Sequence, residues 1–560
     1  MDATSGSFAR PSTIRFGRSL EASTVERNGV KRAGAQATQG ELMSDTQHAV
    51  ASGAASPGAR SAGTQQTSIK FWGLLIGVAA LAAIIAMPQP AGLSVAGQYM
   101  LGIFAFAVII WMTEAVEYAA SSIMLMALMA FLLGLAPDPA HPERALGTGA
   151  ALSVTLDGFT NPAVALIAAS LVIAAAMAIT GLDRRLAFKV ISLLGTSRSR
   201  LLIGTIVVMA VLAFFIPTAS ARVACLTPII LGLISAFGID KKSRVAGMLM
   251  MSICYLSLIW AMGIATGAAQ NVYVNALMER TIHTRISWAD WLIVGAPFSL
   301  ALSVALYFLL MKMMAPRSGE VLAGEVLAGE TAAGNDNIPS APEKLGPMTP
   351  DEIKLLIFSV VLLGFWATEK KLHDFDSSTV AVAAVALMFV PGIGMLKWPQ
   401  VQARVPWGIL IQLGVGVGLG TALLKTGAAA WLASYVVTVF DVQHLSVFAI
   451  LAVLWLFLIV VHLGFASGAA MATTMIPVMI SMLQQTQLPI QKIAGITMLL
   501  SFVTSVGWIL PINGPQNMLA YGTGTFEARD FIRVGLVLTA IAYVMLLAFA
   551  ATYWRWLGYT

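Results

Sequence analysis

Long apolar runs recur along this chain from residue 71 to residue 553, and most of the polar stretches between them are short. A helix needs about 20 mainly apolar residues to cross the hydrocarbon core of a bilayer, and several of these runs reach that length. Composition agrees, because 58% of the 560 residues are hydrophobic and only 11% are charged. The mean hydropathy is +0.82, which is not typical of soluble domains. The sequence therefore predicts an all-α polytopic membrane protein.

The apolar runs divide into single spans and two longer stretches that a polar break interrupts. The interrupted stretches are residues 201–237, broken at Pro217–Ser220, and residues 444–484, broken at Ala466–Ala469. Basic residues at both ends of the first stretch mark the cytoplasmic side, so we interpret it as a re-entrant hairpin and the second stretch as its counterpart. The other runs predict eleven transmembrane helices, near residues 71–87, 99–113, 121–135, 161–180, 245–276, 288–314, 353–368, 380–390, 407–426, 492–521 and 530–553.

The second half of the chain repeats the order of elements in the first half. Thr426 ends one span 246 residues after Thr180 ends another, and each is followed by glycine. Gln516 follows Gln270 by the same interval, and each lies at a polar break within a span. Each half holds five spans and one hairpin, so an odd number of crossings turns the second half upside down. The sequence therefore predicts two inverted repeats, with the first span as an additional leading helix.

Four regions follow from this pattern. Residues 1–68 are rich in Ser, Ala, Gly, Thr and Gln, and we expect a disordered N-terminal tail there. The first half covers residues 69–315 and the second half covers residues 353–560. Residues 316–352 are polar and contain a repeated Gly-Glu-Val-Leu-Ala segment, which predicts a flexible cytoplasmic linker between the halves.

Basic residues indicate the orientation of the chain in the membrane. With a cytoplasmic N-terminus, the linker and the loops that hold Arg184, Lys241 and Arg404 all lie inside. The predicted outer segments 137–160 and 427–443 hold one basic residue and none, as the positive-inside rule requires. We expect an integral protein of the bacterial inner membrane that contacts lipid. No basic patch with interleaved aromatic residues indicates a nucleic-acid partner.

The two hairpin tips and two broken spans bring four half-helix ends to the middle of the membrane. Backbone exposed at that depth needs a protein or ligand partner, and the N-termini of helices favour anions. Thr218, Ser220 and Ser467 can cap these termini or donate to a carboxylate. Carbonyl groups of the broken spans can coordinate a small cation such as Na+, and amides can complete that site; the residues concerned are Gly267, Gln270, Gly514 and Gln516, with Asn271 and Asn517.

Seven motifs between residues 70 and 553 resemble those of the divalent anion:sodium symporter family, which carries di- and tricarboxylates and sulfate. They are Trp111-Met-Thr-Glu-Ala115, Phe159-Thr-Asn-Pro162, Thr180-Gly-Leu-Asp-Arg-Arg185, Pro217-Thr-Ala-Ser-Ala-Arg222, Asp376-Ser-Ser-Thr379, His462-Leu-Gly-Phe-Ala-Ser467 and Asn517-Met-Leu-Ala-Tyr-Gly-Thr-Gly524. The resemblance implies an elevator-type transporter that forms a homodimer. It also implies a Ser-Asn-Thr triplet at each tip that holds substrate carboxylates beside sodium ions, without a covalent cofactor.

The chain departs from that pattern at both tips, because neither triplet contains its asparagine. Arg222 resembles the arginine of the carboxylate-exchanger branch, where a fixed charge can replace a bound sodium, and His462 resembles the same branch. We therefore expect a secondary active transporter of small organic dianions, working by exchange or by Na+-coupled symport. The residues expected to bind the substrate are Thr218, Ala219, Ser220, Arg222, Asn271, Ser467, Gly468, Ala469 and Asn517.

Other functions stay open at this point. The substrate could be an inorganic oxyanion such as sulfate, and the protein could be a receptor that binds an anion without moving it. Ser467 and His462 could also be read as an intramembrane serine protease dyad. A spacing of five residues points two side chains of one helix to different faces, so we expect no enzymatic activity.

A glycine-rich run, Gly414–Gly420, lies inside an apolar span and has no phosphate-binding context. Small residues at this spacing allow two helices to approach closely. We expect close helix packing there.

Overall fold

The computed structural model describes residues 57–138, 141, 143–194, 197–236, 239–316, 346–369, 371–440 and 445–560. The chain divides into two units, residues 1–68 and residues 69–560. Most of the predicted tail and most of the predicted linker lie outside the described residues. Residues 57–68 belong to a helix, so the leading helix begins before the span predicted at residues 71–87.

Every named element in the described residues is a helix. The first half contains α2 (Pro57–Ala86), α3 (Val95–Met112), α4 (Tyr118–Leu135), α5 (Thr148–Leu156), α6 (Pro162–Thr180), α7 (Leu182–Leu194), α8 (Arg198–Phe215), α9 (Ala219–Ala236), α10 (Arg244–Gly263), η1 (Ala265–Gly267), α11 (Ala269–Ile282) and α12 (Trp288–Met313). The second half contains α14 (Pro350–Thr368), α15 (Ser377–Met388), α16 (Trp398–Gln402), α17 (Trp407–Lys425), α18 (Ala428–Phe440), α19 (Val447–His462), α20 (Gly468–Gln484), α21 (Ile490–Ser501), η3 (Phe502–Ser505), η4 (Pro511–Asn513), α22 (Pro515–Tyr521), α23 (Ala528–Ala551) and α24 (Tyr553–Trp556).

Short polar and glycine residues set the helix ends around the site. Ser197, Ser243 and Ser446 cap α8, α10 and α19, because each hydroxyl oxygen accepts a backbone N–H of the first turn. Gly181 and Gly427 take left-handed conformations, with φ of +79° and +78°. Glycine adopts this conformation without steric cost, so the two glycines that the repeat pairs end α6 and α17 in the same way.

The first interrupted stretch is broken close to the predicted Pro217–Ser220, whereas the second break begins three residues before the predicted Ala466–Ala469. The first stretch is helical to Phe215 and again from Ala219, and the second is helical to His462 and again from Gly468. Pro217 lies in the first gap, and a proline disfavours the helical conformation of the residue before it. The crossing topology of these helix pairs stays a prediction.

Two of the predicted spans contain a polar break, expected at Thr266–Asn271 and at Asn513–Asn517. Both breaks begin earlier in the structure. In the first half, α10 ends at Gly263 and α11 starts at Ala269, so Asn271 lies in the first turn of a helix rather than in the break. In the second half the break covers residues 502–514, and Pro515 already starts α22. Proline fits the first helical position because its fixed φ suits the helix and that position needs no N–H donor.

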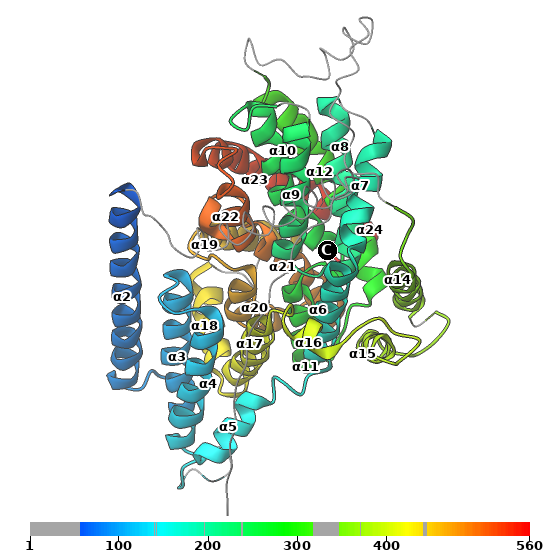
Figure 1. Cartoon of the computed structure of the whole chain (residues 1–560). Coiled ribbons are helices and arrows are strands. Elements are labelled where there is room, and N and C mark those ends of the chain that lie inside the picture. The colour runs from blue at the N-terminus through cyan, green and yellow to red at the C-terminus, as the bar shows by residue number, and fades with distance from the viewer. Residues whose placement is uncertain are drawn as a thin grey trace, which may run out of the picture. The chain divides into compact units, whose positions relative to one another are not determined.

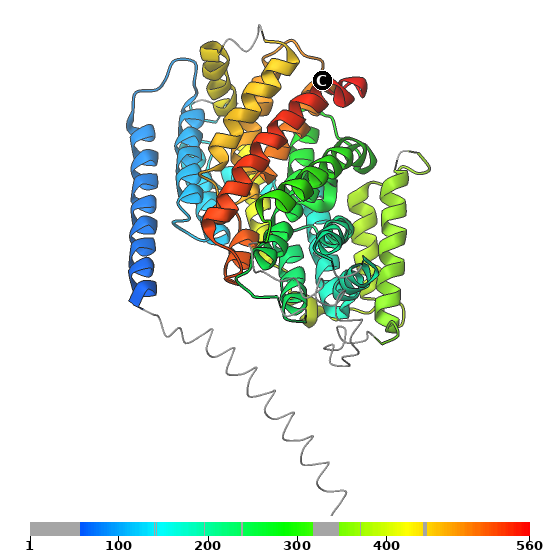
Figure 2. The ribbon, with the colours of Figure 1, turned by 90° about the horizontal axis from the view of Figure 1, so that it is seen from above.

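The helices form two groups. α8, α10 and α12 lie side by side with α9, whereas α3, α4, α17 and α18 form the second group (Figure 1). Turned by 90°, the structure has α14 and α15 beside α6 at one edge (Figure 2). The helix after the first tip, α9, contacts α22 of the second half, and the helix after the second tip, α20, contacts α11 of the first half. Each tip therefore lies close to a half-helix of the other half.

The glycine run of α17 packs closely against neighbouring segments, as predicted. A Cβ atom on Gly418 would overlap the carbonyl oxygen of Thr155, and one on Gly158 would overlap the carbonyl oxygen of Gly414. A Cβ atom on Gly416 would overlap the side chain of Thr473 in α20. These glycines allow α17 to approach both the segment around α5 and α20.

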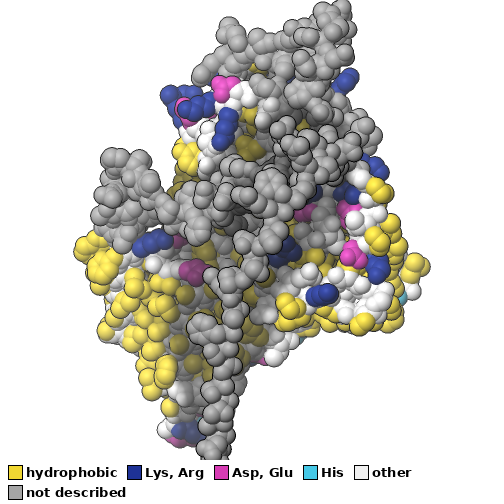
Figure 3. Space-filling view, in the orientation of Figure 1, with side chains coloured by type: hydrophobic (Ala, Val, Ile, Leu, Met, Phe, Trp, Pro, Cys, Tyr) yellow, Lys and Arg dark blue, Asp and Glu magenta, His cyan; other side chains and the backbone are white. Residues whose placement is uncertain are grey.

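The outer face of the described helices is apolar. Within the described residues, eight helices are long and apolar enough to cross a membrane, and several shorter apolar helices include α9, α19 and α20. Hydrophobic side chains cover the lower left face in Figure 3. Exposed hydrophobic residues of the chain include Phe71, Trp72, Ile123 and Phe131. Such a surface suits lipid, so the chain is an integral membrane protein; the count of eleven crossings stays a prediction.

Candidate functional site

The first tip is the connection between α8 and α9. Thr218 caps α9, because its Oγ1 accepts the backbone N–H of Ala221 at 3.3 Å. Ala219 and Ser220 follow in the first turn of this helix. From the sequence, we expect Thr218 either to cap a helix or to bind a ligand. In the structure, Thr218 caps α9.

Arg222 joins the first tip to the first break. Its side chain is 0% exposed, and its guanidinium donates to three backbone carbonyl oxygens. Nη1 donates to Ile216 in the tip at 2.5 Å and to Gly267 in the break at 2.8 Å. Nη2 donates to Ser257 in α10 at 2.6 Å. A single side chain therefore holds the tip, the break and the preceding half-helix together.

The charge of Arg222 is balanced only by dipoles among the described residues. Its recorded partners are carbonyl oxygens rather than a carboxylate, and its Nε has no hydrogen-bond partner in the described part of the chain. A guanidinium stays protonated under nearly all conditions, so this arrangement fixes a positive charge at the tip. That charge attracts an anion and repels Na+.

The second tip, between α19 and α20, is bound by a residue of the second break. Asn513 in η4 donates its side-chain N–H groups to three carbonyl oxygens before the tip, those of His462, Leu463 and Phe465, at 3.1, 3.2 and 3.0 Å. Ser467 caps α20, because its hydroxyl oxygen accepts the N–H of Ala470 at 3.3 Å. Asn513 therefore joins the second tip to the second break, as Arg222 joins the first tip to the first break. Unlike Arg222, Asn513 carries no charge.

His462 is buried beside this network. Its Nδ1 lies 2.7 Å from the carbonyl oxygen of Val503, and Val503 follows Ser257 by 246 residues, the interval of the repeat. Arg222 and His462 therefore contact backbone at matching positions of the two broken spans. His462 lies in α19 and Ser467 caps α20 across the break, and no hydrogen bond between them is recorded in the described residues.

Asn271 and Asn517 stabilise the two breaks in the same way. Asn271 Nδ2 donates to the carbonyl oxygens of Ala261 and Ile264 at 2.6 and 3.1 Å. Asn517 Nδ2 donates to those of Gly507 and Leu510 at 2.7 and 3.5 Å, again 246 residues later. Both Oδ1 atoms are buried and have no hydrogen-bond partner in the described part of the chain. These oxygens accept hydrogen bonds or coordinate a cation, so they suit the cation role predicted for the two asparagines rather than contact with a carboxylate. Substrate binding by Asn271 and Asn517 stays a prediction.

The carbonyl groups predicted to bind Na+ have other partners. The carbonyl of Gly267 accepts from Arg222, and that of Gly514 accepts the N–H groups of Asn517 and Met518 at 3.1 and 3.3 Å. The carbonyl of Gln516 lies 3.9 Å from the Sγ of Cys254. Gln270 contributes its side chain instead, because its Nε2 donates to Ser505 Oγ at 3.3 Å. The prediction of a Na+ site at these carbonyls stays a prediction.

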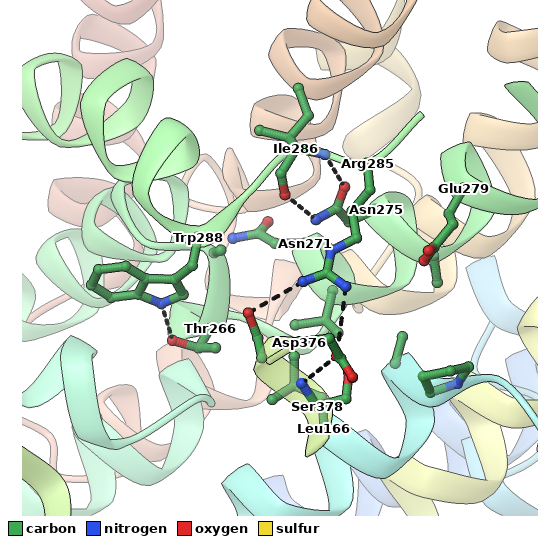
Figure 4. Close-up of a pocket in the computed structure, with 16 residues that line it drawn as sticks. Leu166, Thr266, Asn271, Asn275, Glu279, Arg285, Ile286, Trp288, Asp376 and Ser378 are labelled. Atoms are coloured by element: carbon green, nitrogen blue, oxygen red, sulfur yellow. Dashed lines mark hydrogen bonds and ion pairs between the residues drawn. The ribbon is translucent and has the colours of Figure 1, made fainter. Parts of the chain in front are cut away.

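A separate cavity of about 230 Å³ opens beside the first break. Figure 4 draws it with Trp288 and Glu279 on opposite sides of the view and Arg285 between them. Trp288 Nε1 donates to Thr266 of the break at 3.1 Å, so the cavity extends to the broken span. It also reaches Asn271, whose free Oδ1 is described above.

Charged groups cluster at this cavity. Arg285 Nη2 lies 2.5 Å from Glu369 and Nη1 lies 3.5 Å from Asp376, and the Ser377 hydroxyl donates to Glu369. Burial raises the pKa of Asp376, but hydrogen bonds from Thr379 and Ser378 outweigh it, so its pKa lies below the usual value. Asp376 therefore stays ionised beside Arg285 at neutral pH. With Glu279 included, carboxylates outnumber the single arginine, which disfavours this cavity as the site of a dianion.

Sequence reasoning missed three features of the site. Asn513 is absent from the predicted binding residues, although it follows Gly267 by 246 residues and the repeat pairs the two positions. The side chain of Gln270 was overlooked in favour of its carbonyl. The cluster at Arg285 and Glu369 joins residues far apart in the sequence, and no spacing signals it.

Known proteins resemble this chain along most of its length. The family described as "Sodium:sulfate symporter transmembrane region" matches residues 68–560. A Cupriavidus necator protein named only "Membrane protein" is 46% identical over 488 residues, which cover 87% of this chain and 93% of that one. The sodium-dependent dicarboxylate transporter SdcS of Staphylococcus saprophyticus is 24% identical over 85% of this chain and 89% of its own. The citrate/succinate antiporter of Escherichia coli is 24% identical over 85% of this chain and 96% of its own.

Proposed function

Because the chain belongs to the divalent anion:sodium symporter family, matched over residues 68–560, we propose that it exchanges small organic dianions across the bacterial inner membrane. The substrates are di- or tricarboxylates. Relatives named for a sodium-dependent dicarboxylate transporter and for a citrate/succinate antiporter both cover most of the chain, so the family alone does not choose between symport and exchange. The contacts at the two tips favour one of these modes.

The burial of Arg222 is the observation that favours exchange. Its Nη1 contacts the carbonyl oxygens of Ile216 and Gly267, and its Nη2 contacts that of Ser257. Carbonyl oxygens that face a charged group in this way can coordinate a small cation when no protein cation is present. A permanent charge in that position makes a bound Na+ unnecessary there and unfavourable by repulsion. The substrate anion then binds near the guanidinium of Arg222, which is part of the protein and is not transported. This arrangement suits the exchange of one anion for another.

The charge distribution favours a dianion with two separated carboxylates. Arg222 provides positive charge near the first tip, and both α9 and α20 begin at a tip, where free N–H groups and the helix dipole favour negative charge. A molecule with a carboxylate at each end can satisfy both helix N-termini at once. Sulfate has both charges on one centre and offers no second carboxylate for the other helix, so we rank it below organic dianions.

Na+-coupled symport is the second candidate. The Oδ1 atoms of Asn271 and Asn517 are buried without a partner in the described residues, and such oxygens suit a small hard cation. They lie at matching positions in the first turns of α11 and α22, 246 residues apart. The experiment below separates this candidate from exchange.

The proposal includes the architecture that the family implies: inverted repeats, an elevator-type movement and a homodimer with its N-terminus in the cytoplasm. The reciprocal contacts of α9 with α22 and of α20 with α11 support the repeats. So do the matched bonds of Asn271 and Asn517. An elevator needs one group of helices to move past another, and the two groups of Figure 1 are candidates for them.

Counterflow in proteoliposomes tests the proposal. Purified protein is reconstituted into vesicles loaded with succinate, citrate, malate, sulfate or buffer, and uptake of radiolabelled succinate is followed in NaCl and in choline chloride. Exchange predicts that uptake requires an organic dianion inside and is the same in both salts. Vesicles without protein provide the background.

Three results would contradict parts of this proposal. Uptake into vesicles that hold only buffer, driven by a Na+ gradient, would establish symport instead. Exchange supported by internal sulfate but by no organic dianion would replace the substrate class. No flux of any dianion, from protein that stays monodisperse, would refute the transport of dianions.

A further inference from the structure

Gln270 lies where the first half of the chain meets the second tip. It is half-buried in the first turn of α11, and its side-chain Nε2 donates to the hydroxyl of Ser505 in η3 at 3.3 Å. The same nitrogen lies 3.1 Å from the point where a Cβ atom on Gly468 would be. An amide from one broken span therefore lies over the first residue of α20, which begins at the other half's tip.

Gly468 itself cannot carry a side chain at this point. A Cβ atom there would overlap the carbonyl oxygen of Thr504, which belongs to the backbone and cannot rotate away. Position 468 is also the middle of the tip triplet, where the resemblance expects an asparagine. The space beside the tip is thus closed to a side chain from α20 and is filled by the amide of Gln270.

Hydrogen-bond donors collect around this amide. A primary amide has two N–H groups, and Ser505 takes one of them. Ser467 accepts the N–H of Ala470, whereas Gly468 and Ala469 are the first two residues of α20, where N–H groups have no partner within the helix. The first turn of a helix leaves such donors free for a ligand. Together they suit one carboxylate of a small dianion.

We infer that Gln270 is a substrate-binding residue of the second tip, donating its free amide N–H to a substrate carboxylate that also contacts the N-terminus of α20. This inference rests on the proposed function, since it assumes a dianion at the tips. It assigns the side chain of Gln270 to the anion rather than its carbonyl to a cation. It also gives the two halves unlike roles, because the first tip has the charge of Arg222 and the second has a neutral amide from the opposite half.

Kinetics of succinate exchange in proteoliposomes test the inference. The Gln270→Leu variant keeps the size of the side chain but loses the amide, and we expect its KM to rise about tenfold with a nearly unchanged maximum rate, as for one lost hydrogen bond to a charged group. Gln270→Glu should raise KM further, because a carboxylate there repels the substrate. Ser505→Ala removes the partner of the other N–H and should change KM less than Gln270→Leu.

Gln485→Leu is the matched control, because Gln485 lies beyond α20 and donates to Ala430 away from the tip. A purely structural role of Gln270 would lower the thermal stability and the maximum rate of Gln270→Leu and leave KM unchanged, and this result would overturn the inference. A KM of Gln270→Leu equal to that of Gln485→Leu would also overturn it. If the wild-type protein moves no dianion, the proposed function fails and the inference falls with it, whereas an active wild type with an unaffected Gln270→Leu refutes the inference alone.

Discussion

At the scale of single residues, Arg222 is the side chain on which the mode of transport depends. Arg222→Met keeps the apolar stem of the side chain but removes the guanidinium, and it leaves the carbonyl oxygens of Ile216, Gly267 and Ser257 without their donor. We expect the exchange of succinate in choline chloride to lose about tenfold or more in apparent affinity, since a hydrogen bond to a charged group contributes about 1.5–3 kcal/mol. The measurement is counterflow at varied external succinate.

Sodium provides the sharper part of this test. With the guanidinium removed, the carbonyl oxygens lose their cation and can accept Na+ in its place, so we expect NaCl to restore part of the activity of Arg222→Met. The exposed Arg200 lies at the start of α8 and gives the matched control, Arg200→Met. If Arg222→Met is as active as the wild-type protein in choline chloride, the charge of Arg222 does not hold the substrate.

At the scale of elements, a charge cluster ties the connection between α11 and α12 to the ends of α14 and α15. Arg285 pairs with Glu369 at 2.5 Å, and these side chains are only 21% and 4% exposed. Removing one partner of a largely buried pair leaves the other without compensation. We expect Glu369→Gln to lower the stability of the detergent-solubilised protein by roughly 1–3 kcal/mol, observed as a lower unfolding temperature.

A double-mutant cycle distinguishes this pairing from a general effect on packing. If Arg285 and Glu369 stabilise each other, the combined variant Arg285→Gln with Glu369→Gln loses less stability than the sum of the two single variants. Arg144 forms an ion pair with Asp138 but is 63% exposed, so Arg144→Gln should change the unfolding temperature little. Additive losses at Arg285 and Glu369 would mean that the pair does not couple the two connections.

At the scale of the whole molecule, the sequence predicts much of the order of the helices and less of their contacts. Apolar runs and the interval of 246 residues locate both hairpin tips, because hydrophobic length and internal repetition are local properties of the chain. The ends of the two breaks were misplaced, since Pro515 favours a helix start that the polar residues around it concealed. The partners of Arg222 and the cluster at Arg285 depend on tertiary packing, which no spacing in one sequence records.

The inverted arrangement of the two halves gives the last prediction. Lys241 lies exposed between α9 and α10, and Gln487 lies exposed between α20 and α21, 246 residues later. If the second half enters the membrane upside down, these matching positions face opposite sides, with Lys241 inside because basic residues concentrate there. In a background with Cys225→Ala and Cys254→Ala, we expect a membrane-impermeant maleimide to label the Gln487→Cys variant in intact spheroplasts. The Lys241→Cys variant should react only after permeabilisation. Labelling of both variants from the same side would mean that the halves are parallel, and the two tips could not then approach one site from opposite faces of the membrane.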